Sequence, residues 1–84
     1  MITIKILGPG CANCKKLESI ARQVIDKTAV EAEIIKVTDF NVIGDFGVVA
    51  TPGLVINEKV VSSGRIPTSA EVTNWITDAD SAKG

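Results

Sequence analysis

Apolar residues recur with two different periods along the chain, and these periods divide it into predicted strands and helices. Residues 2–7 form a short, Ile-rich run that is typical of a mostly buried strand. Three turn-forming residues, 8–10, follow it. Apolar residues then recur at helical spacing from Leu17 to Ile25, which predicts a long amphipathic helix. Residues 33–37 predict a second strand.

The second half of the chain predicts a short helix, a hairpin and a terminal helix. Asp39 is a suitable N-cap for a helix that ends at Gly47. The apolar residues of this helix are Val42, Ile43 and Phe46. Two apolar runs, 54–56 and 60–61, flank a turn at 57–59. Thr68 and Glu71 form a capping box at the start of the last helix, whose apolar face carries Val72, Trp75, Ile76 and Ala79. Residues 80–84 are expected to be a frayed tail.

The predicted order is strand, helix, strand, helix, strand, strand, helix. A crossover helix joins the first two strands, so these strands must run parallel, whereas the last two form an antiparallel hairpin. The chain is therefore expected to be one α/β domain, residues 1–84, with a four-stranded mixed sheet flanked by three helices. Its 84 residues suffice for one modest core.

Composition excludes several classes of function. The formal net charge is −1, with acids and bases interleaved, so the chain lacks the basic stripe of a nucleic-acid-binding protein. No apolar run approaches the ~20 residues of a membrane span, and the first residues do not resemble a secretory signal. With only two cysteines, the chain is expected to be a cytoplasmic protein. A monomer is the default expectation.

Those two cysteines form a C-x-x-C motif, Cys11-Ala12-Asn13-Cys14, where the first strand passes into the first helix. A thiol at a helix N-terminus has a lowered pKa, because the helix dipole and unpaired amides favour negative charge. The second thiol lies one turn further on the same face, close enough to close a disulfide. The motif therefore indicates dithiol–disulfide chemistry. Soft-metal binding and two inert core cysteines are the alternatives.

The order of elements, the C-x-x-C motif and a Thr-Pro before the third strand resemble the thioredoxin fold in its smallest, glutaredoxin-sized form. The chain is most similar to the short prokaryotic thioredoxin-like group known as redox-active disulfide proteins. The residues that carry this resemblance are Gly8, Gly10 to Cys14, Pro52-Gly53-Leu54 and Gly64-Arg65. The resemblance covers nearly the whole chain.

The resemblance implies a thiol–disulfide oxidoreductase that needs no cofactor or metal. Cys11 would be the attacking thiolate and Cys14 the resolving thiol. Pro52 would follow a cis peptide bond beside Cys11, and the Thr51 backbone would pair with an extended substrate segment. The implied substrate-binding residues are Thr51, Pro52, Gly10, Ala12 and Asn13. The implied partners are disulfide-bearing proteins and an upstream disulfide reductase of the thioredoxin reductase type.

The chain departs from the thioredoxin and glutaredoxin patterns at several positions. Gly10 stands where thioredoxins carry a Trp, and Ala12-Asn13 replaces their Gly-Pro. Thioredoxins commonly use an acid in the first strand for proton transfer, but no acid lies between Met1 and Cys14. Residues 63–65 replace the glutaredoxin Gly-Gly followed by an acid. Arg65 is expected to be a surface cation.

A soft-metal site is the alternative function. The loop that contains the two cysteines also resembles the G-x-x-C-x-x-C loop of heavy-metal-associated domains, which bind Cu(I) through two thiolates. Those domains usually place Met shortly before the first cysteine, where this chain has Pro9, and they end on a strand. The predicted terminal helix therefore favours the oxidoreductase.

Overall fold

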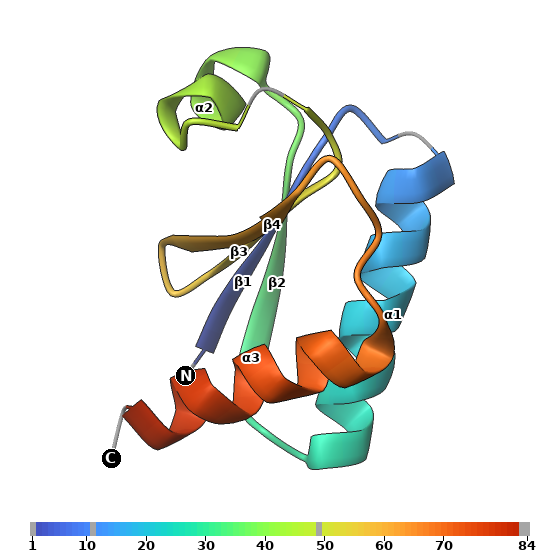
Figure 1. The fold of residues 1–84 in the computed structure, drawn as a ribbon, viewed down its shortest axis with the longest axis vertical. Coiled ribbons are helices and arrows are strands. Elements are labelled where there is room, and N and C mark those ends of the chain that lie inside the picture. Colours follow the sequence, from blue (N-terminus) through green and yellow to red (C-terminus); the bar gives the residue numbers. More distant parts are fainter. Residues whose placement is uncertain (1, 11, 49, 83–84) are drawn as a thin grey trace.

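The computed structural model describes residues 2–10, 12–48 and 50–82. Within these ranges the chain forms one mixed four-stranded sheet and three helices (Figure 1). The elements are β1 (Ile2–Leu7), α1 (Ala12–Thr28), β2 (Ala32–Val37), α2 (Phe40–Asp45), β3 (Gly53–Ile56), β4 (Lys59–Ser63) and α3 (Ser69–Ala82). Their order is the predicted one, so the predicted fold class is confirmed.

The sheet has the strand order β2-β1-β3-β4, which places β1 at its centre. β1 runs parallel to β2, with Ile4 opposite Ile34, because α1 carries the chain back along the sheet between them. β3 runs antiparallel to both β1 and β4. The predicted parallel pair and terminal hairpin are therefore both confirmed.

The main core lies between the sheet and the two long helices, which cover the same face (Figure 1). Alternate residues of β1 point toward these helices, as the period of two in a strand requires. The buried members of this cluster are Ile2, Ile4, Ile6, Leu17, Ala21, Val24, Leu54, Ile56, Val72 and Ile76. Each large apolar side chain buried here contributes about 1.5–3 kcal/mol relative to an exposed one. Trp75 is half-buried and packs against this cluster.

A smaller cluster lies on the other face of the sheet, beneath α2. Its buried residues are Leu7, Ile43, Val48 and Val55, and Phe46 packs against them. Lys5 lies 5.2 Å above the Phe46 ring and is 2.6 Å from the Glu58 carboxylate. The predicted helix is present as α2, and Asp39 is its N-cap. The side chain of Asp39 accepts a hydrogen bond from the Asn41 amide at 2.8 Å.

The apolar side chains of α2 differ in how far they are buried. Val42 is 39% exposed and Phe40 is 66% exposed, whereas Ile43 is buried. A helix of six residues makes fewer than two turns, so only one narrow stripe of it can face the sheet. After Phe46, Gly47 adopts the left-handed conformation (φ 78°), as predicted for the residue that ends the helix.

The hairpin turn between β3 and β4 consists of Asn57 and Glu58, both with positive φ (51° and 67°). Such a two-residue turn matches the twist of the strands it joins. Asn57 also ties the turn to β1. Its amide donates to the Thr3 carbonyl at 2.8 Å, and its side-chain oxygen accepts from the Thr3 amide at 3.0 Å.

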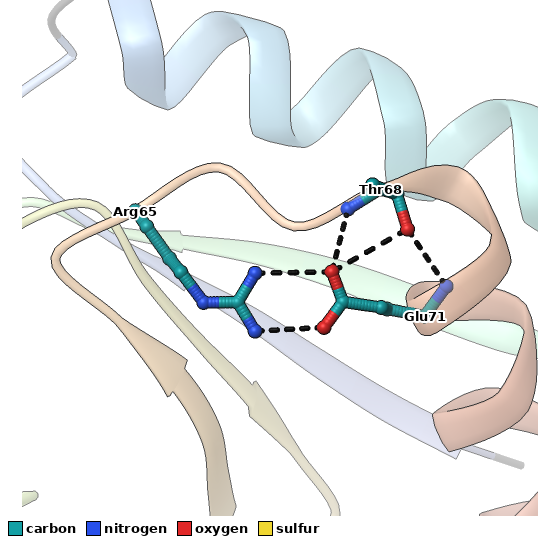
Figure 2. A network of polar contacts seen from close by, with 3 residues as sticks. All are labelled: Arg65, Thr68 and Glu71. Atoms are coloured by element: carbon teal, nitrogen blue, oxygen red, sulfur yellow. Dashed lines mark hydrogen bonds and ion pairs between the residues drawn. The ribbon is translucent and has the colours of Figure 1, made fainter.

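The N-terminus of α3 has the predicted capping box (Figure 2). The Glu71 amide donates to Oγ1 of Thr68 at 3.2 Å, and the Thr68 amide donates to Oε1 of Glu71 at 3.1 Å. Arg65 adds two parallel hydrogen bonds to the same carboxylate, at 3.0 and 2.7 Å. Arg65 is the expected surface cation, but its partner was not predicted.

The last helix is longer than the sequence pattern indicated. α3 continues to Ala82, so residues 80–82 are helical and not a frayed tail. The chain has no Gly or Pro between Thr68 and Gly84, and therefore nothing in this stretch breaks the helix. The remaining tail residues, 83–84, lie outside the described residues.

We expect Glu71→Gln to destabilise the fold near neutral pH and to have little effect in acid. The Arg65 guanidinium and the Thr68 amide lower the pKa of Glu71 from 4.5 to about 2. A depressed carboxyl pKa contributes stability above its unfolded value, and this contribution is lost as the pH falls through the folded pKa. The difference in urea midpoint between the wild type and the variant should therefore be full above pH 4.5 and vanish near pH 2.

Glu31→Gln is the matched control, because it removes the same charge from an exposed position ahead of β2. Its midpoint should stay close to that of the wild type at every pH. The difference in urea midpoint between the wild type and Glu71→Gln could instead stay constant from neutral pH to pH 2. That result would show that the Arg65–Thr68–Glu71 network does not stabilise the fold through its charge.

Candidate functional site

The loop between β1 and α1 consists of Gly8, Pro9 and Gly10, and it leads directly into the C-x-x-C motif. The Gly8 amide donates to the Val37 carbonyl at 2.9 Å, which fixes the loop to the end of β2. Gly10 is exposed and has φ 88°, a conformation that residues other than glycine rarely adopt. α1 begins at Ala12, and the predicted nucleophile, Cys11, lies outside the described residues.

Cys14 lies in the first turn of α1 and is only 5% exposed. Its Sγ packs against Gly8 so closely that a Cβ at Gly8 would overlap it. Gly8 is therefore more than a turn residue. Because it has no side chain, the sulfur of Cys14 can occupy the adjacent space. This contact between Gly8 and Cys14 joins the loop after β1 to the first turn of α1.

The Thr51–Pro52 segment lies on the other side of the same space. The peptide bond between these two residues is cis. Thr51 is half-buried and Pro52 is buried. A Cβ at Gly8 would lie 3.7 Å from Cβ of Thr51 and 3.5 Å from Cβ of Cys14, so the fold brings Cys14 and Thr51 together at Gly8.

The other predicted site residues lie at the surface. Ala12 and Asn13 are exposed in the first turn of α1, and Gly10 is exposed just before it. The structure therefore gathers buried Cys14 and Pro52, half-buried Thr51 and these three exposed residues at one end of the sheet. Cys11 is the one predicted site residue whose position is not described.

A small cavity of about 60 Å³ lies beside Cys14, and two of its residues were missed by the sequence analysis. Glu18 and Lys36 both line it, and their side chains form an ion pair of 3.2 Å. Arg22 pairs with the same carboxylate at 2.8 Å. The hydrogen bonds from Arg22 and Lys36 hold the pKa of Glu18 below its ordinary value. The spacing of Glu18, four residues after Cys14, was a signal that could have identified it.

A larger cavity of about 330 Å³ lies between α3 and the β3–β4 hairpin. Trp75, Ile56 and Val61 supply its apolar lining, and Lys59 and Asp78 supply charges. It shares no lining residue with the cavity beside Cys14.

Two further properties concern metals and membranes. Across residues 2–10, 12–48 and 50–82, no three His, Cys, Asp or Glu side chains gather as a set of metal ligands. In the same part of the chain, no helix combines the length and the apolar character needed to cross a bilayer.

The arrangement of these elements defines a thioredoxin fold. Thioredoxin-2 of the malaria parasite, a component of its protein secretion machinery, superimposes with a TM-score of 0.71 at 12% identity, over 93% of this chain and 82% of that one. The germline-specific thioredoxin Deadhead of Drosophila melanogaster gives a TM-score of 0.66 at 17% identity, over 92% and 79%. At these identities the likeness concerns the fold alone.

Sequence comparison identifies the family. Residues 2–77 match the family model described as a thioredoxin domain. The thioredoxins of Methanocaldococcus jannaschii and Methanothermobacter thermautotrophicus are each 35% identical over 72 residues, which is 86% of this chain and 83% and 94% of theirs. The chain belongs to the thioredoxin family, and at the family level this supports a thiol–disulfide oxidoreductase. The alternative of a copper-binding domain gains no support, because the family model and both of these relatives are thioredoxins.

We expect Gly8→Ala to destabilise the fold and to displace the Cys14 side chain. The added methyl group must overlap Sγ of Cys14, and overpacking of this kind costs about 1–3 kcal/mol. Urea unfolding of the reduced protein measures the loss of stability, and the alkylation rate of Cys14 in a Cys11→Ser background reports its displacement.

Gly44→Ala is the matched control, because a Cβ at this helical position meets nothing within 4 Å. It should be neutral or stabilise by up to about 1 kcal/mol. Equal unfolding midpoints for Gly8→Ala and Gly44→Ala would contradict the close packing of Cys14 against Gly8.

Proposed function

We propose that this chain is a dithiol electron carrier that reduces protein disulfides through Cys11 and Cys14. The observation that carries the proposal is the burial of Cys14 in the first turn of α1, against the glycine loop, in a member of the thioredoxin family. A buried second thiol that follows an attacking thiol by one helical turn suits the resolving step of disulfide exchange.

In the first step, the Cys11 thiolate attacks one sulfur of the substrate disulfide. A Cys11–substrate mixed disulfide forms, and the other substrate sulfur leaves as a thiolate that takes up a proton. In the second step, Cys14 loses its proton and its sulfur attacks Cys11, which releases the second substrate thiol. The two cysteines have then lost two electrons, which the two substrate sulfurs have gained, and a Cys11–Cys14 disulfide remains.

The helix supports the first of these steps. α1 has 17 residues, and its N-terminal end directly follows Cys11 in the sequence. Unpaired amides and the helix dipole favour negative charge at such an end. The first turn of α1 contains no acidic residue that would oppose a thiolate there.

Substrate is proposed to bind around Gly10, Ala12, Asn13, Thr51 and Pro52. The first three are exposed beside the motif, and Gly10 leaves an approach free of side chains. The backbone of Thr51 is proposed to pair with an extended segment of the substrate. An upstream reductase of the thioredoxin reductase type would return two electrons to the disulfide. The chain, residues 1–84, would act as a cytoplasmic monomeric domain without a cofactor.

The test is the reduction of insulin by dithiothreitol with catalytic amounts of this chain. We expect the wild type to accelerate the reaction and Cys11→Ser to leave only the uncatalysed rate. In a separate incubation of the reduced variant with a disulfide substrate and no dithiothreitol, Cys14→Ser should accumulate a covalent complex, because nothing resolves its mixed disulfide.

Lys16→Gln serves as the matched control, since it changes an exposed residue of the same helical turn without removing a thiol. It should retain nearly the full rate. Full activity of Cys11→Ser, or no acceleration by the fully reduced wild type, would contradict the proposed function.

A further inference from the structure

The cavity beside Cys14 is lined by several charged side chains. Its volume is about 60 Å³, which is enough to admit water. Its described ionisable residues are Cys14, Lys15, Glu18 and Lys36, and Thr38 adds a neutral hydroxyl. Gly8 and Gly10 complete the wall from the loop. The thiol that must lose a proton during exchange therefore faces two cations and one carboxylate.

Glu18 is held in place more firmly than the other charges of this cavity. Its side chain is only 16% exposed, whereas that of Lys36 is 63% exposed. Arg22 approaches the carboxylate from the next helical turn and Lys36 approaches it from β2. The same two partners lower its pKa, so Glu18 remains ionised across the neutral range. It is a fixed negative charge and a poor proton acceptor.

The distance from Glu18 to the thiol follows from the helix. Residues four apart on a helix have Cβ atoms about 5–6 Å apart, so Cys14 and Glu18 are neighbours on one face of α1. No acid lies in β1, where thioredoxins commonly place one. Among the described residues, the carboxylate that lines the cavity beside Cys14 is that of Glu18, on α1.

We propose that Glu18 and Lys36 act on Cys14 as a balanced pair of charges, which holds the readiness of the thiol to lose its proton between the values that either charge alone would give. This proposal rests on the proposed function, in which Cys14 is the resolving thiol. Glu18 disfavours a Cys14 thiolate and Lys36 favours it. As long as they are paired, their two effects largely cancel. A change that removes one of these two charges upsets the balance beside the sulfur.

The sign of each effect follows from this cancellation. Glu18→Gln leaves Lys36 unopposed, so the pKa of the Cys14 thiol falls. Lys36→Gln removes a cation from the cavity and leaves Glu18 paired only with Arg22, so the pKa of the thiol rises. For one charge at this separation we expect a shift of at least about 0.5 pKa unit in each direction. The double variant should return close to the wild-type value.

The experiment is an ultraviolet titration of the thiolate in a Cys11→Ser background, where Cys14 is the single thiol. The chain contains no Tyr and no His, so no phenolate or imidazole titrates alongside the sulfur. The pKa of Cys14 is measured in the background protein, in Glu18→Gln, in Lys36→Gln and in the double variant. Circular dichroism and urea midpoints verify that each variant is folded.

Asp26→Asn and Lys27→Gln are the matched controls on the same helix. They remove the same charges from exposed residues about 12 Å beyond Glu18, more than one screening length at physiological salt. These controls should leave the pKa of Cys14 unchanged. Shifts of the same sign in Glu18→Gln and Lys36→Gln, or shifts no larger than those of the controls, would overturn the proposal.

A second measurement separates this proposal from the proposed function. The pH dependence of the reduction potential is followed in the protein with both cysteines, where the slope changes at each thiol pKa. The change of slope at the pKa of Cys14 should occur at lower pH in Glu18→Gln and at higher pH in Lys36→Gln. A chain that fails to reduce insulin but shows these shifts would disprove the function and leave the ion-pair effect intact.

Discussion

The contact between the Cys14 sulfur and Gly8 is the constraint on which the site depends. It joins the end of β1 to the start of α1, because the sulfur fills the space that a side chain at Gly8 would occupy. The same position touches Thr51, so the loop before β3 meets the other two elements at one point. The close approach of Leu7 and Val48 to Gly53, at 3.3 Å from a Cβ built there, extends this dense packing into β3. The sulfur of Cys14 is therefore closely packed on the side of the loop.

Much of the fold could be predicted from local patterns, because the relevant signals lie within a few residues of one another. The Thr68–Glu71 capping box and the Asp39 cap are contacts across two or three residues, and both are present. The parallel pairing of β1 with β2 follows from the crossover helix between them. α3 is longer than predicted, because Ala79 is the last residue of its predicted apolar face but not of the helix. A helix without breakers continues past its buried face.

The parts of the site that sequence reasoning missed depend on tertiary contacts. Lys36 lies 18 residues beyond Glu18, on β2, and only the packing of α1 on the sheet brings the two charges together. Arg65 was predicted only as a surface cation, because its ion pair with Glu71 depends on the path of the loop before α3. The exposure of Val42 likewise depends on how little of α2 the sheet can cover. Side-chain pairing across elements is set by the fold, and a single sequence carries no direct record of it.

The position of β1 between β2 and β3 affects the order in which the sheet can form during synthesis. β1 is synthesised before the other strands of the sheet, yet one of its two neighbours, β3, begins only at Gly53, after α1, β2 and α2. A contact between segments so distant in sequence requires the closure of a long loop before it contributes any stability. During synthesis, β1, α1 and β2 can therefore associate as a unit that already contains both cysteines. The Thr51–Pro52 segment of the site is synthesised only just before β3. The nascent chain therefore exposes its thiols before the site around them is complete.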